Sequence, residues 1–169
     1  MEKGRGLGGR MATRRMEGAR IDHGAQFFTV RDSRMEELLS LWVAEKAVVP
    51  WYDHIPGLPD LPRGQRYRGT EGMTSPAKVL AKEFSVETNL FVDRITRDGQ
   101  KWLISEREGE GRQLQADHLV MTIPSVQLLE LFERSDYSLD EDTMNSIRSI
   151  RHTRCLAVLG IMDLSLIHI

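Results

Sequence analysis

Hydrophobic residues change their spacing several times along the chain, which predicts both helices and strands. A helix is expected from Ser33, where Ser33 and Glu36 match a capping box, with its inward residues at helical spacing: Met35, Leu38, Leu39, Trp42 and Val43. A second helix should begin at Ser75-Pro76, because serine caps helices and proline suits the first turn. Its expected inward residues are Val79, Leu80 and Phe84.

From Ser85 the pattern favours strands. Strand-forming residues run from Val86 through Thr88, Leu90 and Val92 to Ile95, and Asp98-Gly99 is a strong hairpin turn. Residues 101–106 then predict a second strand with Trp102 and Ile104 on one face, and a third short strand is expected near Gln113. These elements predict an antiparallel meander.

Two uninterrupted apolar runs, residues 118–123 and 155–162, predict strands that are covered on both faces. One helix should begin at Pro124-Ser125, with these residues inward: Val126, Leu128, Leu129, Leu131 and Phe132. Another should be capped by Ser138, with Leu139, Met144, Ile147 and Ile150 inward. Residues 48–52 suggest a short extended piece, and the Pro- and Gly-rich residues 56–64 suggest a loop.

Composition narrows the class of protein. The chain has 169 residues, 40% of them hydrophobic, and a net charge of -2, which suits a folded domain with a sizeable core. There is no apolar run long enough for a membrane span, and the single Cys155, among apolar neighbours, suggests a buried thiol. We therefore expect a cytoplasmic protein with no membrane partner. Basic residues concentrate in the first twenty positions without a longer stripe, so no nucleic-acid partner is expected.

The N-terminal segment carries the first candidate chemistry. Glu2-Lys3 is followed by a glycine-rich loop with Arg10, and a carboxylate beside such a loop suits a ribose and a pyrophosphate. Gly4, Gly6 and Gly9 match G-x-G-x-x-G literally, but that pattern requires a preceding strand. We therefore interpret Glu2 as the acid that ends the second strand of a βαβ unit, with an earlier strand and glycine loop expected before it. A disordered basic tail is the alternative.

The block from Asp22 to Thr29 is the second candidate. Small residues at Gly24 and Ala25, next to the amide of Gln26, suit contact with a flat heteroaromatic ring. The alternative is a turn followed by a core strand in which Phe27 is buried. The five histidines lack metal-ligand spacing, so no metal is expected, and no motif assigns a catalytic residue. Asp140, Glu141 and Asp142 are interpreted as solvent-facing acids at a helix start.

These blocks, in this order, resemble the renalase-like branch of the flavin amine oxidase superfamily. The resemblance is carried by Glu2-Lys3 and residues 8–11, 22–29, 69–73 and 120–124, and it extends from Glu2 to Met162. It implies an α/β fold: a partial FAD/NAD(P)-binding Rossmann-like domain with an inserted antiparallel meander and part of a mixed-sheet substrate domain. The implied segments are FAD-binding in residues 1–32 and 73–134, and substrate domain in 33–72 and 135–169.

The resemblance also implies a cofactor, FAD, and residues that bind it. Glu2, with Lys3 beside it, would bind the adenosine ribose, and the loop Gly8, Gly9, Arg10 and Met11 would lie beside the pyrophosphate. Val92 would bracket the adenine, and Gly24, Ala25 and Gln26 would approach the isoalloxazine ring. Family members carry a true glycine loop before Glu-Lys and continue beyond Met162, so weak FAD binding or none is expected of this chain.

The function implied by the resemblance is hydride transfer from a small molecule to flavin and then to oxygen. The substrate would be a small amine or a dihydronicotinamide, which makes an NAD(P)H-related molecule a candidate partner. The competing hypothesis is a noncatalytic α+β binding module that recognises an anionic partner through Arg5, Arg10, Arg14 and Arg15.

Overall fold

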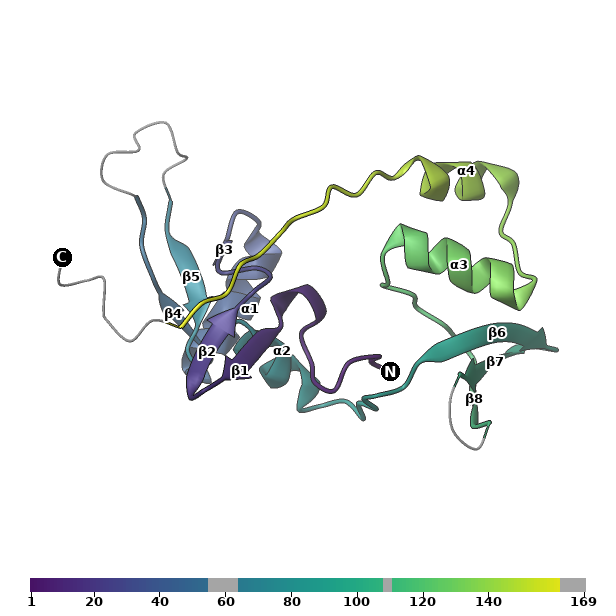
Figure 1. Cartoon of the computed structure of the whole chain (residues 1–169), viewed down its shortest axis with the longest axis horizontal. Helices are drawn as coiled ribbons and strands as arrows, with labels where there is room; N and C mark the ends of the chain where they lie inside the picture. Colours follow the sequence, from purple (N-terminus) through teal and green to yellow (C-terminus); the bar gives the residue numbers. More distant parts are fainter. Residues whose placement is uncertain (55–63, 108–110, 162–169) are drawn as a thin grey trace. The chain divides into compact units, whose positions relative to one another are not determined.

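The computed structural model describes residues 1–54, 64–107 and 111–161 (Figure 1). The chain divides into two compact units, which we describe separately. Unit 1 contains Met1–Lys3 and Asn89–Cys155, and unit 2 contains Gly4–Thr88 with the described residues 156–161. The predicted loop at residues 56–64 lies outside the described residues except for Gly64.

Unit 1 is built on the predicted antiparallel meander. Its strands β6 (Val92–Asp98), β7 (Lys101–Glu106) and β8 (Gln113–Ala116) are hydrogen-bonded in that order. The two-residue turn after Asp98 contains Gly99 with φ 59°, a conformation that glycine adopts without strain. Ile95 and Ile104 are paired across β6 and β7 and are both buried, as the alternation of apolar residues predicts.

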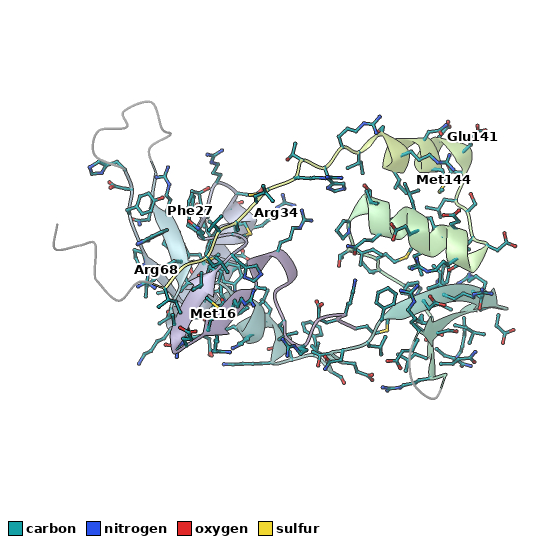
Figure 2. The ribbon with its side chains drawn as sticks, in the orientation of Figure 1. Met16, Phe27, Arg34, Arg68, Glu141 and Met144 are labelled. Carbon is teal, nitrogen blue, oxygen red and sulfur yellow. The ribbon has the colours of Figure 1, made fainter. Side chains whose placement is uncertain are left out.

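Two helices cover this sheet on one side. α3 (Ser125–Ser135) packs on β6, and α4 (Glu141–Ser149) packs on α3 (Figure 1). Met144 of α4 lies toward α3 (Figure 2), and it joins a buried core formed by Ile95, Ile104, Leu131 and Phe132. The Ser125 Oγ lies 2.8 Å from the His152 Nε2, which holds the segment after α4 against the start of α3.

Unit 2 begins with the 3-10 turn η1 (Gly9–Met11) and the hairpin of β1 (Thr13–Met16) and β2 (Ala19–Asp22). Glu17 and Gly18 form the hairpin turn with φ 50° and 81°. A second sheet has the order β3 (Phe28–Thr29), β5 (Arg66–Gly69), β4 (Val48–Pro50). Helices α1 (Ser33–Ala44) and α2 (Thr74–Ala81) complete the unit.

The core of unit 2 lies between α1 and the sheet of β3, β5 and β4. Trp42, Ala47 and Val48 are buried there, and residues from α1, the sheet and α2 pack against them: Phe28, Met35, Leu38, Leu39, Tyr67 and Val79. Phe28 meets Trp42 edge-to-face with ring centroids 5.6 Å apart, and it stacks on Tyr67 at 5.7 Å. The predicted inward face of α1 is therefore confirmed at Met35, Leu38, Leu39 and Trp42.

Helix starts differ from the predictions by one or two residues. Asp32, not Ser33, caps α1, because its carboxylate accepts a hydrogen bond from the Arg34 N–H at 2.9 Å. Asp140, not Ser138, caps α4 and accepts from the Thr143 N–H at 2.9 Å. Helix α2 begins at Thr74 after Met73, which places Pro76 third in the helix instead of first. For α1 and α4 a neighbouring aspartate supplies the cap, which spacing alone does not resolve, whereas Met73 before α2 makes no side-chain capping bond.

The two apolar runs do not form strands. Residues 118–123 and the described part of 155–162 are irregular, and Val120, Leu156 and Val158 are 84%, 96% and 97% exposed. A strand buried on both faces requires flanking strands and helices, and the described residues supply none for these runs. Cys155 is likewise exposed instead of buried.

Several predicted inward residues at helix and strand ends are also exposed. Phe84 is 70% exposed beyond the end of α2, and other residues near helix ends are exposed as well: Val43, Leu80, Val126 and Ile150. Val86, Thr88 and Leu90 precede the first strand of the meander instead of belonging to it. The predicted mixture of helices and strands is confirmed, but every pairing between named strands in the described ranges is antiparallel.

The structure also bears on the membrane and on the basic N-terminus. Within the described residues, each helix is too short or too polar to cross a bilayer. Arg14, Arg15 and Arg20 lie on the β1–β2 hairpin, so that part of the predicted basic tail is ordered.

Candidate functional site

Three blocks that are distant in sequence meet in unit 2. The Arg10 carbonyl accepts a hydrogen bond from the Ala25 N–H at 2.9 Å, which joins the glycine-rich turn to the loop after β2. The Met73 N–H donates to Asp22 Oδ1 at 2.9 Å, which joins β2 to the start of α2. The structure therefore brings together residues 8–13, 22–25 and 69–75, which include three of the blocks singled out in the sequence.

The glycine-rich turn requires glycine at Gly8. Gly8 has φ 112°, and a Cβ there would lie 3.0 Å from the Thr74 Cγ2. Its carbonyl accepts from the Met11 N–H at 2.7 Å, and the Gly9 carbonyl accepts from the Ala12 N–H at 3.0 Å. The turn is therefore tight, while Gly9 and Arg10 are exposed and accessible to a ligand.

Gly24 lies very close to the backbone of the glycine-rich turn. A Cβ at Gly24 would lie 2.0 Å from the Arg10 carbonyl oxygen, a separation at which one of the two backbones would have to move. The packing holds the loop of Gly24, Ala25 and Gln26 against the turn, while all three residues remain exposed. An exposed loop with a fixed backbone can present its amide groups to a flat ligand.

A polar cluster beneath the turn caps α2. The Thr13 hydroxyl donates to Asp22 Oδ1 at 2.5 Å, and the Thr74 N–H donates to Thr13 Oγ1 at 3.3 Å. Together with the bond from the Met73 N–H, these contacts use donors that a helix start leaves unpaired. The negative charge of the Asp22 carboxylate also interacts favourably with the positive end of the helix dipole. The N-terminus of α2 is thus partnered within the protein.

The Gly69–Met73 block packs on the same cluster. A Cβ on Gly72 would lie 2.4 Å from Thr13 Oγ1, and one on Gly69 would lie 2.0 Å from the Gly72 carbonyl oxygen. Arg20 of β2 forms an ion pair with Glu71, which fixes the hairpin to this turn. The two glycines therefore allow the turn before α2 to lie directly against β1.

The remaining predicted residues gather in unit 1. The Glu2 carbonyl accepts from the Leu90 N–H at 3.1 Å, and the Lys3 Nζ lies 4.7 Å from the Phe91 ring centroid. Val92 follows directly at the start of β6 and packs against the core of unit 1. The structure thus places Glu2 and Lys3 beside the strand start that contains Val92. The other predicted binding residues belong to unit 2: Gly8, Gly9, Arg10, Met11, Gly24, Ala25 and Gln26.

An aromatic cluster in unit 2 was not predicted. The Phe27 ring centroid lies 6.2 Å from that of Trp51 and 5.9 Å from that of Tyr52, and the Arg66 guanidinium carbon lies 5.5 Å from the Phe27 centroid. Phe27 is 38% exposed, so the alternative in which it is buried in a core strand is wrong. The alternation of basic and aromatic residues at 66–68 was a signal for this cluster, but their partners are distant in sequence.

Beside this cluster, a hydrogen bond between neighbouring side chains changes the pKa of one carboxyl group. His54 Nδ1 lies 2.6 Å from Asp53 Oδ1, and this bond lowers the pKa of Asp53 below its ordinary value. Both side chains are exposed. No group of three or more metal-ligating side chains is found within residues 1–54, 64–107 and 111–161.

Comparison with known families finds a match at the N-terminus. Residues 1–42 are similar to the NAD(P)-binding Rossmann-like domain. The matched segment contains Glu2, Lys3, the glycine-rich turn and the loop of Gly24 to Gln26, whereas Val92 lies outside it. The match supports a dinucleotide-binding module of the oxidoreductase type, with FAD or NAD(P) as the class of cofactor.

Proposed function

We propose that this chain is part of an FAD-dependent oxidoreductase of the renalase-like kind. Its substrate is a small amine or a dihydronicotinamide, from which a hydride is transferred to flavin and its electrons then to oxygen. The observation that carries the proposal is the tight packing of the glycine-rich turn against Gly24 and α2, within and beside the segment that matches a dinucleotide-binding family.

The residues of the turn fit a dinucleotide. A Cβ on Gly8 would come within 3.0 Å of Thr74, so the turn keeps a compact backbone that can lie close to phosphate oxygens. Gly9 and Met11 complete this backbone, and the exposed Arg10 side chain supplies a positive charge beside it. These residues would hold the pyrophosphate.

The other predicted residues would bind the remaining parts of the cofactor. Glu2 and Lys3 would hold the ribose, and Val92 would lie beside the adenine, which agrees with the backbone bond between Glu2 and Leu90 two residues before Val92. Gly24, Ala25 and Gln26 would approach the flavin ring, to which Gln26 would present its side-chain amide. When bound, flavin supplies the hydride-accepting chemistry, and the protein binds and orients the substrate.

A flavin titration of the purified chain tests this proposal. We expect saturable quenching of FAD fluorescence with a weak dissociation constant, between about 10 μM and 1 mM. Arg10→Gln should weaken binding by roughly fivefold, as expected for one exposed charge pair. Lys78→Gln, which removes an exposed charge on α2, should leave it unchanged.

The same titration with NAD+ and NADP+ identifies the class of cofactor. Tighter binding of a nicotinamide dinucleotide than of FAD would contradict the flavin assignment. Absence of saturation by FAD and by both nicotinamide dinucleotides would contradict the proposed dinucleotide binding by this chain and favour the noncatalytic binding module.

A further inference from the structure

We propose that a pocket in unit 2, next to Phe27, binds a planar aromatic monoanion such as an aromatic carboxylate. The pocket has a volume of about 490 Å³ and is lined by residues from three places: β3 with its flanking residues, the start of β5 with the two residues before it, and α1. The residues that carry the proposal are Phe27, Arg31, Glu36, Arg66 and Tyr67. This volume falls within the range of small-molecule sites in proteins.

The aromatic wall of the pocket is held in place from several sides. The rings of Trp51 and Tyr52 contact Phe27 and each other, with the Trp51 and Tyr52 centroids 4.7 Å apart. Figure 2 shows Phe27 in unit 2, where β3 and β5 lie. A supported and partly exposed ring is suited to stack with a second flat ring, because aromatic pairs add attraction beyond area burial.

Arg66 fixes a positive charge in the lining. The residue is 7% exposed, and its Nη1 donates to the carbonyls of Asp53 at 2.9 Å and of Gly64 at 3.1 Å. Its backbone is fixed as well, because its N–H donates to the Tyr52 carbonyl at 2.8 Å. The guanidinium therefore keeps its position and lies 4.9 Å from the Tyr52 ring centroid.

The charge of the lining favours an anion. Arg31 and Arg66 contribute two positive charges against the single acid Glu36. Arg31 is exposed, and within the part of the chain that the structure describes it forms no ion pair. A carboxylate on the ligand would pair with Arg31 while its ring packs on Phe27, whereas an ammonium group would meet two like charges.

The pocket adjoins the loop assigned to the flavin ring, because Phe27 follows Gln26 directly. The identification of this pocket as the substrate pocket rests on the proposed function, whereas the proposal that it binds an aromatic anion does not. Under that assignment the lining charge disfavours the small-amine alternative of the proposed function and favours an aromatic substrate that carries a negative charge.

Titration with small aromatic probes tests the site without any flavin. The chain has three tryptophans, so their indole N–H signals in a ¹H–¹⁵N NMR spectrum report separately on Trp51, Trp42 and Trp102. Benzoate should shift the Trp51 signal in a saturable way, more strongly than neutral benzamide or cationic benzylamine. Trp42 and Trp102 lie in the two cores and should not respond.

Variants separate the two contacts. Arg31→Gln should weaken benzoate binding by about fivefold and remove the preference for benzoate over benzamide. Phe27→Leu should weaken both probes, and Lys78→Gln should leave binding unchanged. An unshifted Trp42 signal in each variant shows that the core remains folded.

Three results would overturn the inference. They are a failure of benzoate to saturate the Trp51 shift, equal or tighter binding of benzamide or benzylamine, and unchanged benzoate binding by Arg31→Gln. Since FAD is absent from these titrations, a failure here leaves the flavin titration to decide the proposed function separately.

Discussion

The Thr13 hydroxyl donates a 2.5 Å hydrogen bond to Asp22 Oδ1, the same oxygen that accepts the Met73 N–H at 2.9 Å. One carboxylate oxygen thus joins both strands of the β1–β2 hairpin to the start of α2. Thr13 Oγ1 also accepts a hydrogen bond from the Thr74 N–H, and the Thr74 hydroxyl oxygen lies 3.3 Å from Thr13 Oγ1. Few polar groups of the cluster are therefore left without a hydrogen-bond partner inside it. The glycine-rich turn and the loop after β2 are both attached to this cluster.

Removing the Thr13 hydroxyl should therefore destabilise unit 2. Thr13→Val keeps the shape of the side chain but leaves the Thr74 N–H and Asp22 each without one partner, at a cost of about 1–3 kcal/mol. Urea unfolding followed by circular dichroism measures this loss, and hydrogen exchange at the Met73 and Thr74 amides localises it. Thr13→Ser retains the hydroxyl and should recover most of the stability; equal stability of the Val and Ser variants would contradict the role of the bond.

Ser135 makes the corresponding link in unit 1. Its hydroxyl donates to the Leu131 carbonyl at 2.6 Å and accepts from the Ile95 N–H at 2.9 Å, joining α3 to β6. Ser135→Ala would leave the Ile95 N–H buried without this acceptor, and we expect a loss of about 1–3 kcal/mol in urea unfolding. Ser149→Ala removes an exposed hydroxyl from the end of α4 and should change stability by less than about 0.5 kcal/mol. Similar losses in both variants would argue against this link.

Local sequence patterns predicted those parts of the fold that depend on residues close together in the sequence. The meander of β6, β7 and β8 follows from alternating apolar residues and a glycine turn, both of which act over a few positions. The strands predicted from the apolar runs were wrong over residues 118–123 and 155–161, because a buried strand depends on partners from elsewhere in a fold. The hairpin of β1 and β2 was missed because basic and glycine residues obscured its alternation.

The candidate site was predictable in its parts but not in its assembly. Gly8 and Gly24 were identified from the family resemblance, yet nothing in the sequence shows that Gly24 packs on the Arg10 carbonyl. No sequence pattern singled out Thr13, although its hydroxyl bonds to Asp22 and to the start of α2. The pocket beside Phe27 depends on Arg66, whose contacts with residues 27, 52 and 53 require tertiary structure.

The cap of α4 should make that helix sensitive to acid. The Thr143 N–H bonds to the Asp140 carboxylate and lowers the pKa of Asp140 below its ordinary value. A depressed folded-state pKa means that the stabilisation is complete above the ordinary pKa and is lost as the pH falls through the folded pKa. Unfolding midpoints measured across the acidic range should therefore fall less steeply in Asp140→Asn than in the native chain. Asp142→Asn removes a neighbouring charge without a capping bond and should retain the native slope; identical slopes in all three would contradict the prediction.

Gly24 offers the sharpest test of how the turn and the loop fit together. In Gly24→Ala the new Cβ would lie 2.0 Å from the Arg10 carbonyl oxygen, so the two backbones must separate and the bond from the Ala25 N–H to that oxygen must lengthen or break. We expect a loss of about 1–3 kcal/mol, as for other overpacked positions, together with faster hydrogen exchange at the Ala25 amide. Gly6→Ala is the matched control, because a Cβ there meets nothing within 4 Å. If Gly24→Ala were as stable as Gly6→Ala and the Ala25 amide remained protected, the close packing of the turn against the loop would be wrong. The physical basis for a preformed dinucleotide site would be lost with it.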